Sequence, residues 1–402
     1  MLFRLSTYRI VVFVLCGLWL NAPSIAQMAD YVQGAVSPVE EAAIYLLLRS
    51  TRFELRDLLR SQFQDPRRRT KRDLMILDDT VTQVSGEKME GCSFGRCGSR
   101  KTTVLCHVIV GLYYLGVIQE GWLDFCLKIN QKHPKRPVGR PRKELVHAKA
   151  TTKLGLALEM LKGLLDWGYG GLTVVFDAWY AWPCFLADLV ALGYHFVTRA
   201  RWDSPVRVDG QGMTVQEFFD QQMRSYKRRG QTTTLYSARI IELVGVGRVK
   251  AVCVRYWCAG ERCYKDAVLI TDHLTWTGPE VLDAYQSRWR IEQAIEETKQ
   301  CFGLENYHVR SWGSIHHYLT LSMLAFNVSQ VMRQAATSAP PVPTLVVQFR
   351  LDHLAEQIGR GQQQVWRKLY WGIRELYDST EFPEWEIVEA LFQSVLIPNY
   401  QT

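Results

Sequence analysis

The chain has 402 residues, of which 48% are hydrophobic and 22% are charged. This length predicts two or three domains, and this composition excludes an intrinsically disordered chain, a collagen and a coiled-coil rod. The 48 Lys and Arg residues exceed the 40 Asp and Glu residues, which gives a formal net charge of +8. That mild basic excess is compatible with a polyanionic partner.

The amino-terminal segment has two interpretations. Arg4 and Arg9 precede an apolar run over residues 10–20, and the small residues Ser24 and Ala26 follow it, as in a secretory signal peptide. The run is too short to span a bilayer as a helix. The alternative is a buried helix, a short turn and a second helix capped by Ser24, as in a helix-turn-helix. Apolar residues of that second helix have helical spacing: Ile25, Met28, Ala29 and Val32.

A mixed α/β region is predicted after residue 70. The run Leu74–Leu77 has the pattern of a buried strand that ends at Asp78, and residues 104–118 predict two strands separated at Gly111. Strands over 172–176 and 194–198 and helices over 148–167 and 183–192 follow. Asp177 comes directly after the strand 172–176.

The residue pattern changes twice in the second half of the chain. Residues 201–271 alternate Gly, Thr, Val and Tyr, which predicts a separate, mostly β insertion. Helical periodicity resumes at Gly278-Pro279-Glu280. Pro279 indicates that a helix begins here, since proline is favoured at the first position of a helix. Helices are expected over 278–301, 316–335 and 351–377.

Three carboxylates form the candidate chemical site: Asp78, Asp177 and Glu292. Each alone has an ordinary structural explanation, as a residue of a turn or of an exposed helix. Two Asp at strand ends and a Glu on a helix that crosses the sheet can nevertheless converge on one oxygen-rich site. Mg²⁺ prefers such ligands, and paired ions of this kind support phosphodiester cleavage.

The segment around Glu292 carries a polar stripe. Tyr285, Arg288, Glu292 and Lys299 have the spacing Tyr-x2-Arg-x3-Glu-x6-Lys, which places them within an arc of roughly 60° on one helix. The neighbouring apolar stripe would pack this helix on the sheet; it consists of Ile291, Ile295 and Phe302. Cations beside a metal-binding carboxylate suit a phosphate backbone. The alternative is a solvated face with an Arg288–Glu292 pair.

On these residues the chain resembles the insertion-sequence DDE transposases of the Tyr-Arg-Glu-Lys (YREK) signature group, over roughly residues 70–335. The motifs are Leu77-Asp78-Asp79-Thr80, Phe176-Asp177-Ala178-Trp179-Tyr180 and the segment from Tyr285 to Lys299. The resemblance implies an RNase H-like fold in which Asp78, Asp177 and Glu292 bind Mg²⁺, with Mn²⁺ able to substitute. The family pattern Asp-x-Thr points to Asp78, but the sequence leaves Asp79 open as the first ligand.

The resemblance also implies an activity and its partners. A metal-activated water would cut the phosphodiester at the end of a mobile element, and the freed 3′ end would attack the opposite strand or target DNA. Tyr285, Arg288 and Lys299 would contact DNA near the cleaved end. Trp257 and Trp276 are the candidates to stack on a flipped base, although each could equally be a core or interface aromatic. The partners would be double-stranded element ends and target DNA, bound by a homodimer in a synaptic complex, with no membrane involved. We therefore expect a cytoplasmic protein that retains its amino terminus.

The expected fold is an RNase H-like mixed sheet flanked by helices and interrupted by the β insertion, with helical terminal regions. The expected parts are a DNA-binding region (1–70), the catalytic core (71–200 and 276–335), the insertion (201–275) and a helical carboxy-terminal region (336–402). Two basic runs, 135–143 and 224–229, lie outside the site. The first resembles an AT-hook, although a solvated loop that touches phosphates is the favoured interpretation.

Two other functions share part of this pattern. Another RNase H-like nuclease would have the carboxylates without needing the Tyr, Arg and Lys stripe. A catalytically silent DNA-binding protein derived from a transposase would not need intact Asp78, Asp177 and Glu292. An exported protein would separate the carboxylate site from chromosomal DNA, which argues against the signal-peptide interpretation.

Overall fold

The computed structural model describes most of the chain between residues 5 and 351. The gaps within that range are residues 21, 23, 26, 29–31, 33–38, 51–53, 64, 66–69, 71, 85–88, 98–101, 130–150, 225–232, 259–261 and 336–339. The AT-hook-like run and the helix expected over 351–377 lie outside the described residues, apart from residue 351. Residues 342–351 are helical.

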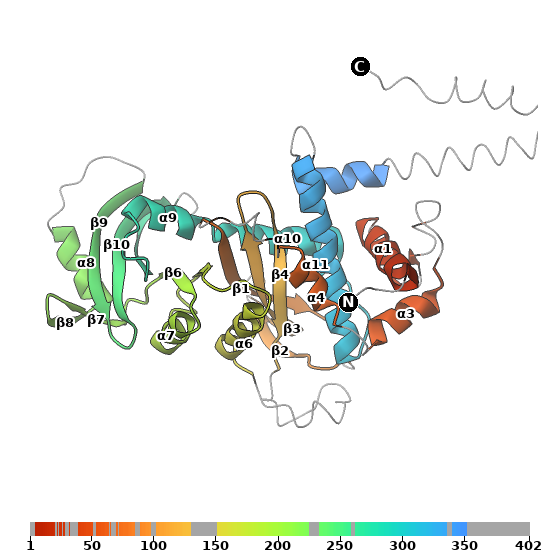
Figure 1. The fold of residues 1–402 in the computed structure, drawn as a ribbon, viewed down its shortest axis with the longest axis horizontal. Coiled ribbons are helices and arrows are strands. Elements are labelled where there is room, and N and C mark those ends of the chain that lie inside the picture. Colours follow the sequence, from red (N-terminus) through yellow and green to blue (C-terminus); the bar gives the residue numbers. More distant parts are fainter. Residues whose placement is uncertain are drawn as a thin grey trace, which may run out of the picture.

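A mixed sheet forms the centre of the molecule (Figure 1). Strand β1 (Leu74–Gln83) pairs antiparallel with β3 (Thr102–Leu115) on one side and parallel with β5 (Thr173–Phe176) on the other. β5 pairs in parallel with β6 (His195–Arg199). The apolar runs of β1 and β5 are buried because helices cover both faces of this part of the sheet, as is typical of parallel strands.

The two faces of the sheet have different helical covers, which fixes where each β1 side chain points. Met75 and Leu77 pack in a hydrophobic cluster with α6 (Lys153–Leu165) and α7 (Pro183–Ala191). Ile76 packs in the opposite cluster, with α10 (Trp289–Phe302) and α11 (Trp312–Ala335). Since side chains alternate along a strand, Asp78 belongs to the α10 face and Asp79 to the α6 face.

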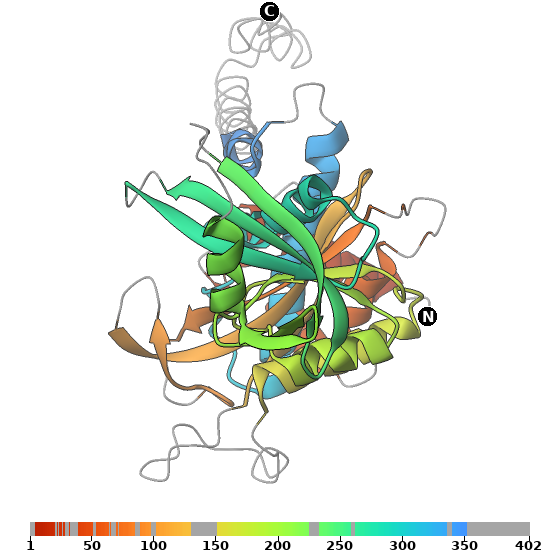
Figure 2. The same cartoon turned by 90° about the vertical axis from the view of Figure 1, so that its left-hand side faces the viewer.

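The β-rich segment after β6 extends the same sheet. Its strands are β7 (Pro205–Val208), β8 (Gln211–Thr214), β9 (Thr233–Leu243), β10 (Gly247–Cys258) and β11 (Cys263–Thr271), and α8 (Val215–Arg224) precedes β9. β11 pairs antiparallel with β6, so the prediction of a separate insertion was wrong with respect to the sheet. Figure 2 shows these strands (green) from the end of the molecule. The domain boundaries stay a prediction.

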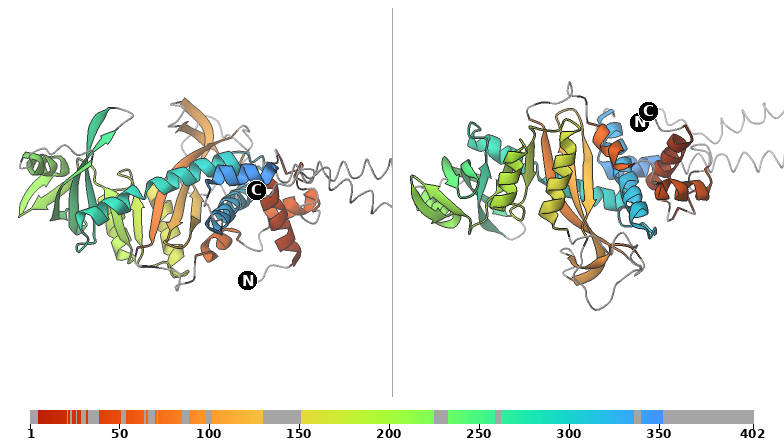
Figure 3. Two further views of the ribbon diagram at one scale, coloured as in Figure 1. Left: turned by 90° about the horizontal axis from the view of Figure 1, so that it is seen from above. Right: turned by 60° about the horizontal axis from the view of Figure 1, so that its bottom comes forward.

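Two consecutive helices, α9 (Gly278–Gln286) and α10, cross one face of this extended sheet. α9 contacts β6 and β11, and α10 follows it over β1. Figure 3 shows the two helices in cyan, one after the other along the sheet. Thr277 begins α9 with a capping box, in which its hydroxyl accepts from the Glu280 backbone while the Glu280 carboxylate accepts from Thr277.

The break expected at Gly111 is absent, because β3 runs without interruption through this residue. A Cβ atom at position 111 would lie 2.7 Å from the Trp122 ring, so close packing, rather than a turn, requires the glycine. The turn lies further along, and β4 (Glu120–Leu127) returns antiparallel to β3. Strand β2 (Ser93–Cys97) pairs antiparallel with the start of β3.

The amino-terminal apolar run is a helix packed in the core. α1 (Leu5–Trp19) contacts α11, and Val14, Leu18 and Trp19 are buried there. The Trp19 indole N–H donates to the Ala325 carbonyl at 3.2 Å. Most of the expected second helix lies outside the described residues, although Ile25, Met28 and Val32 are buried. No helix in the described ranges is long and apolar enough to cross a membrane.

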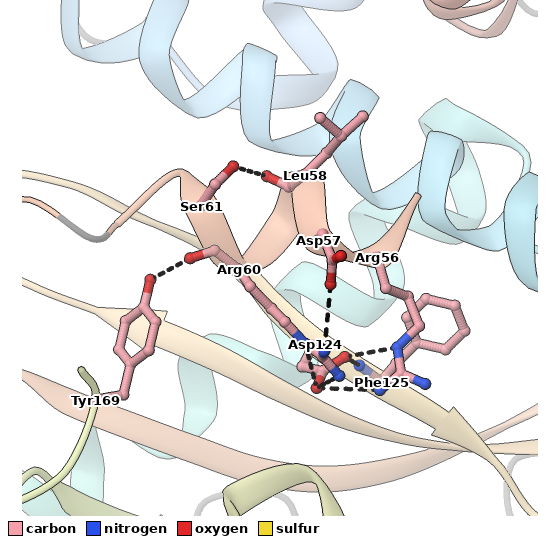
Figure 4. A network of polar contacts seen from close by, with 8 residues as sticks. All are labelled: Arg56, Asp57, Leu58, Arg60, Ser61, Asp124, Phe125 and Tyr169. Atoms are coloured by element: carbon pink, nitrogen blue, oxygen red, sulfur yellow. Dashed lines mark hydrogen bonds and ion pairs between the residues drawn. The ribbon is translucent and has the colours of Figure 1, made fainter. Parts of the chain in front are cut away.

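Two shorter helices complete this region, α3 (Glu41–Arg49) and α4 (Arg56–Ser61). Figure 4 shows how α4 is attached to β4. The Asp124 carboxylate is fully buried and accepts from the guanidinium of Arg56 at 2.9 Å and of Arg60 at 2.8 Å. The Tyr169 hydroxyl donates to the Arg60 carbonyl at 2.6 Å, which ties α4 to a third part of the chain.

Helix α11 contains a buried neutral histidine that predicts an acid-sensitive fold. His316 stacks on Phe125 with ring centroids 5.6 Å apart, and its Nε2 is buried without a hydrogen-bond partner among the described residues. Burial, followed by the nearby charge of Arg56, lowers the pKa of His316 from 6.5 to about 3. The unfolded chain therefore binds a proton that the folded chain does not, between these two pKa values.

Because of this difference, the free energy of unfolding should fall as pH drops below 6.5. His316→Phe keeps the ring stack and is expected to remove about 1.5 kcal/mol of the loss between pH 6.5 and 5. Urea unfolding of both proteins at a series of pH values measures this difference. His308→Gln, at an exposed position, is the control. Parallel pH profiles for wild type and His316→Phe would contradict the expectation.

Candidate active site

Asp78 and Asp177 lie at matching positions on neighbouring strands. The pairing of β1 with β5 joins Leu74–Ile76 to Thr173–Val175, and each Asp follows the last paired residue by two positions. Asp177 thus follows the end of β5, as the sequence predicts. Asp78 lies inside β1 instead of at its end, because β1 continues along β3 to Gln83.

The environment of Asp78 favours its protonated form. Burial raises the pKa of Asp78 to about 7, and the nearby negative charges of Asp177 and Asp79 act in the same direction. The Asp79 N–H, which donates to Asp78 Oδ1 at 2.8 Å, and the charge of Arg288 partly oppose the shift. A group of carboxylates this close together attracts a cation.

Arg288 brings the third carboxylate to this place. Its Nη1 lies 3.4 Å from Asp78 Oδ2 and 2.5 Å from Glu292 Oε1, so one guanidinium nitrogen contacts both acids. Glu292 lies in the first turn of α10, where the positive end of the helix dipole favours a negative charge. The structure therefore gathers Asp78, Asp177 and Glu292 from three distant parts of the sequence.

The donor atoms at this place fit Mg²⁺, which is bound in proteins by carboxylate oxygens and water. In the part of the chain that the structure describes, no three His, Cys, Asp or Glu side chains are grouped tightly enough to hold a metal ion as they stand. Arg288 lies between Asp78 and Glu292 and keeps their carboxylates apart. A divalent ion would compete with this guanidinium for the same oxygens.

Asp79 belongs to a different cluster. Its carboxylate accepts from the Lys153 ammonium at 2.6 Å and from the Tyr180 hydroxyl at 3.0 Å. Lys153 begins α6, on the face of the sheet opposite α10. Of the two aspartates, Asp78 contacts Arg288 and Asp79 contacts Lys153, and the choice of Asp78 as the first ligand stays a prediction.

A buried ion cluster holds α10 in place. Glu120, the first residue of β4, is 7% exposed and accepts from Arg290 of α10 and from Arg333 of α11. The side chains of Ile291 and Phe302 are buried beside β1 and β3 residues, as the predicted apolar stripe requires. These contacts fix the helix turn that carries Glu292.

The polar stripe lies on two helices instead of the one that was expected. α9 ends at Gln286 and α10 begins at Trp289, and the turn between them is tightened by a hydrogen bond from the Arg288 N–H to the Tyr285 carbonyl. Tyr285 and Arg288 still lie together, with the guanidinium carbon 6.0 Å from the ring centroid. Burial raises the pKa of Tyr285, which keeps its hydroxyl protonated.

Lys299 lies further along α10, beside the end of β1. Its ammonium donates to the Val81 carbonyl at 2.8 Å and pairs with Glu305 at 2.8 Å. About a quarter of its side chain is exposed. Lys299 is thus near the later part of β1, the strand that contains Asp78, and its ammonium already has a carboxylate partner.

A cleft of about 500 Å³ opens beside Asp177, between the β-rich part of the sheet and α9. Its polar and aromatic lining includes Asp177, Arg199, Trp257, Tyr285, Arg288 and Trp289. Trp257 is 43% exposed there. Trp276, the other predicted stacking residue, lies parallel to the His273 ring at 4.1 Å and does not line the cleft.

The sequence did not identify three residues near this site. Arg199 ends β6 and lines the cleft, but single basic residues at strand ends carry no signal. Trp289 and Trp179 are 59% and 46% exposed and lie within the recognised motifs. The motif sequences do not predict that these two side chains are exposed.

Residues 143–328 match the family model described as the transposase DDE domain. The match supports a DDE transposase. It includes Asp177 and Glu292, begins after Asp78, and spans less than half of the chain. No curated protein matches the chain. This similarity suggests DNA as the partner, and the mixed sheet with helices is consistent with the α/β fold of such enzymes.

Proposed function

We propose that the protein is a Mg²⁺-dependent transposase of the YREK group that cuts DNA at the ends of its mobile element and transfers the 3′ ends to target DNA. The observation that supports this most is that Arg288 contacts both Asp78 and Glu292, while Asp177 lies close enough for its charge to raise the pKa of Asp78. The proposed fold of the core is RNase H-like. The proposed working unit is a cytoplasmic homodimer that holds two element ends.

In this proposal Asp78, Asp177 and Glu292 hold the divalent ions, and Mn²⁺ can replace Mg²⁺. Two such ions would stabilise the attacking and leaving oxygens of an in-line displacement. Asp78 is part of β1 and Asp177 directly follows β5, so the sheet would position both carboxylates before DNA binds. No covalent link between protein and DNA is needed, because positioning and charge stabilisation suffice.

The cleft residues supply the DNA contacts. Arg288 and Tyr285 lie at the boundary between the carboxylates and the cleft, where a phosphate group would pass from one to the other. Arg199 adds a second cation on the opposite wall. Trp257, which is exposed in the same cleft, is the better placed of the two tryptophans to stack on a flipped base.

A cleavage assay on the DNA that flanks the coding region tests this function. The purified protein should nick or cut at the element end in the presence of Mg²⁺ or Mn²⁺, and chelation by EDTA should stop the reaction. The released 3′ end should then join to an added target duplex. Binding of the end without any cleavage under these conditions would favour a catalytically silent DNA-binding protein.

Arg288→Ala and Lys299→Ala are expected to weaken binding of end-bearing DNA and to flatten its dependence on salt. Each phosphate contact that is lost should reduce the slope of log K against log salt by about 1. The effect of Lys299 should be the smaller of the two, because Arg288 lines the cleft and Lys299 does not. Fluorescence anisotropy over a range of salt concentrations measures both slopes.

Arg207→Ala is the matched control for these variants. Arg207 is an exposed arginine of β7 that pairs with Glu242, far along the sheet from the carboxylates. Its slope should equal that of the wild type. If Arg288→Ala, Lys299→Ala and wild type have equal slopes, neither Arg288 nor Lys299 contacts a DNA phosphate.

A further inference from the structure

Trp179 is an exposed aromatic residue next to the carboxylate site, on the side away from the cleft. It follows β5 by three residues, and its backbone N–H donates to Asp177 Oδ1 at 2.9 Å. The side chain is 46% exposed and does not line the cleft that contains Trp257. The carboxylate of Asp177 therefore has an exposed tryptophan on the α6 side and another on the cleft side.

Neighbouring side chains fix the Trp179 ring. Tyr180 packs against it edge-on, with centroids 4.9 Å apart, and the Lys153 ammonium lies 4.6 Å from the ring centroid. Lys153 and Tyr180 are themselves held by the Asp79 carboxylate. A ring that is held in place and still almost half exposed has little freedom left to lose when a flat ligand binds it.

The chemistry of this group suits a nucleobase with its phosphate. Nucleobases stack on exposed aromatic side chains irrespective of sequence, and a lysine beside the ring attracts the backbone. An apolar protein partner is a poorer match, because docking would bury the ammonium of Lys153 as well as the ring. Asp79 keeps that ammonium next to the ring, so the cation and the stacking surface form one unit.

We propose that Trp179 and Lys153 form a second DNA contact: the indole stacks on an unpaired base next to the cleaved bond, and the ammonium contacts the adjoining phosphate. This inference rests on the proposed function for the position of the cleaved bond. It places the DNA strand across the end of β5, between Trp257 on one side of Asp177 and Trp179 on the other.

Single-turnover cleavage of intact and abasic DNA tests the stacking. On intact end-bearing DNA, Trp179→Ala should slow cleavage by about 5- to 150-fold, the factor that corresponds to about 1–3 kcal/mol per stacked base. Trp179→Phe should retain most of the rate. On DNA that lacks the stacked base, wild type and Trp179→Ala should cleave equally fast. Trp182→Leu, an exposed tryptophan of the same loop, is the control.

A binding experiment keeps this inference separate from the cleavage activity. DNA with 2-aminopurine at single positions near the end is bound in the presence of Ca²⁺, and its fluorescence should be quenched by wild type more than by Trp179→Ala at one position. Position-specific quenching in Ca²⁺, combined with no cleavage of the same DNA in Mg²⁺ or Mn²⁺, would refute the proposed function and leave the contact standing. A loss of rate by Trp179→Ala that is equal on intact and on every abasic DNA, with no position-specific quenching, would overturn the contact.

Discussion

Replacing Asp177 or Glu292 by alanine is expected to abolish strand cleavage while end-bearing DNA remains bound. Each change removes a carboxylate from the group that would hold the divalent ions, and the loss should reach about 10³-fold or more, as for other residues that act as a unit in catalysis. Binding should persist because the cations of the cleft, including Arg199, are unchanged. Gel analysis of cleavage and a mobility-shift assay on the same DNA measure the two effects separately.

The control for these variants is Glu296→Ala. Glu296 is an exposed glutamate of the same helix, α10, and its carboxylate contacts Gln300 instead of Arg288. It should cleave at the wild-type rate. Because Glu292→Ala also frees Arg288 from one partner, Glu292→Gln should be measured beside it. A cleavage rate close to wild type for Asp177→Ala or Glu292→Ala would eliminate the carboxylate mechanism.

Asp124→Ala is expected to lower the free energy of unfolding by about 3–5 kcal/mol, because it leaves buried positive charge without its partner. The Asp124 side chain is fully buried, while Arg56 and Arg60 are each 15% exposed. The effect should appear as a lower urea midpoint of unfolding. Asp124→Asn keeps one acceptor oxygen and should lose less.

Asp57→Ala provides the comparison, since Asp57 contacts Arg60 from the exposed surface of the same helix. An exposed pair of this kind contributes about 0.2–1 kcal/mol, so this variant should be nearly as stable as wild type. Replacing Asp124, Arg56 and Arg60 together by apolar residues should recover much of the loss if unpaired charge is its cause. A triple variant as unstable as Asp124→Ala would show that packing, and not charge, dominates.

The sequence was informative where local signals and tertiary structure agree. The apolar runs before Asp78 and Asp177 predicted buried strands, and both strands exist, in parallel and side by side. The apolar stripe of Ile291 and Phe302 predicted which face of the helix packs on the sheet. These predictions succeeded because burial imposes a period on the sequence that a short window contains.

Features set by distant residues could not be predicted in this way. Gly111 read as a break, because nothing near it in the sequence announces the ring of Trp122. The pairing of β11 with β6 joins residues about 70 positions apart by backbone hydrogen bonds, which any two strand edges can form. The pairing of Lys299 with Glu305 depends on how the chain turns after α10.

The continuous sheet has a mechanical consequence for the way DNA enters. The wall that carries Trp257 is joined to the strand before Asp177 through an unbroken ladder: β10 to β11, β11 to β6, and β6 to β5. A lid that swings on a loose linker could close around its substrate, but a wall built into the same sheet cannot. In the proposed function the duplex would therefore be the component that yields, and we expect sequences whose steps kink and unstack easily at the element end to be cut fastest.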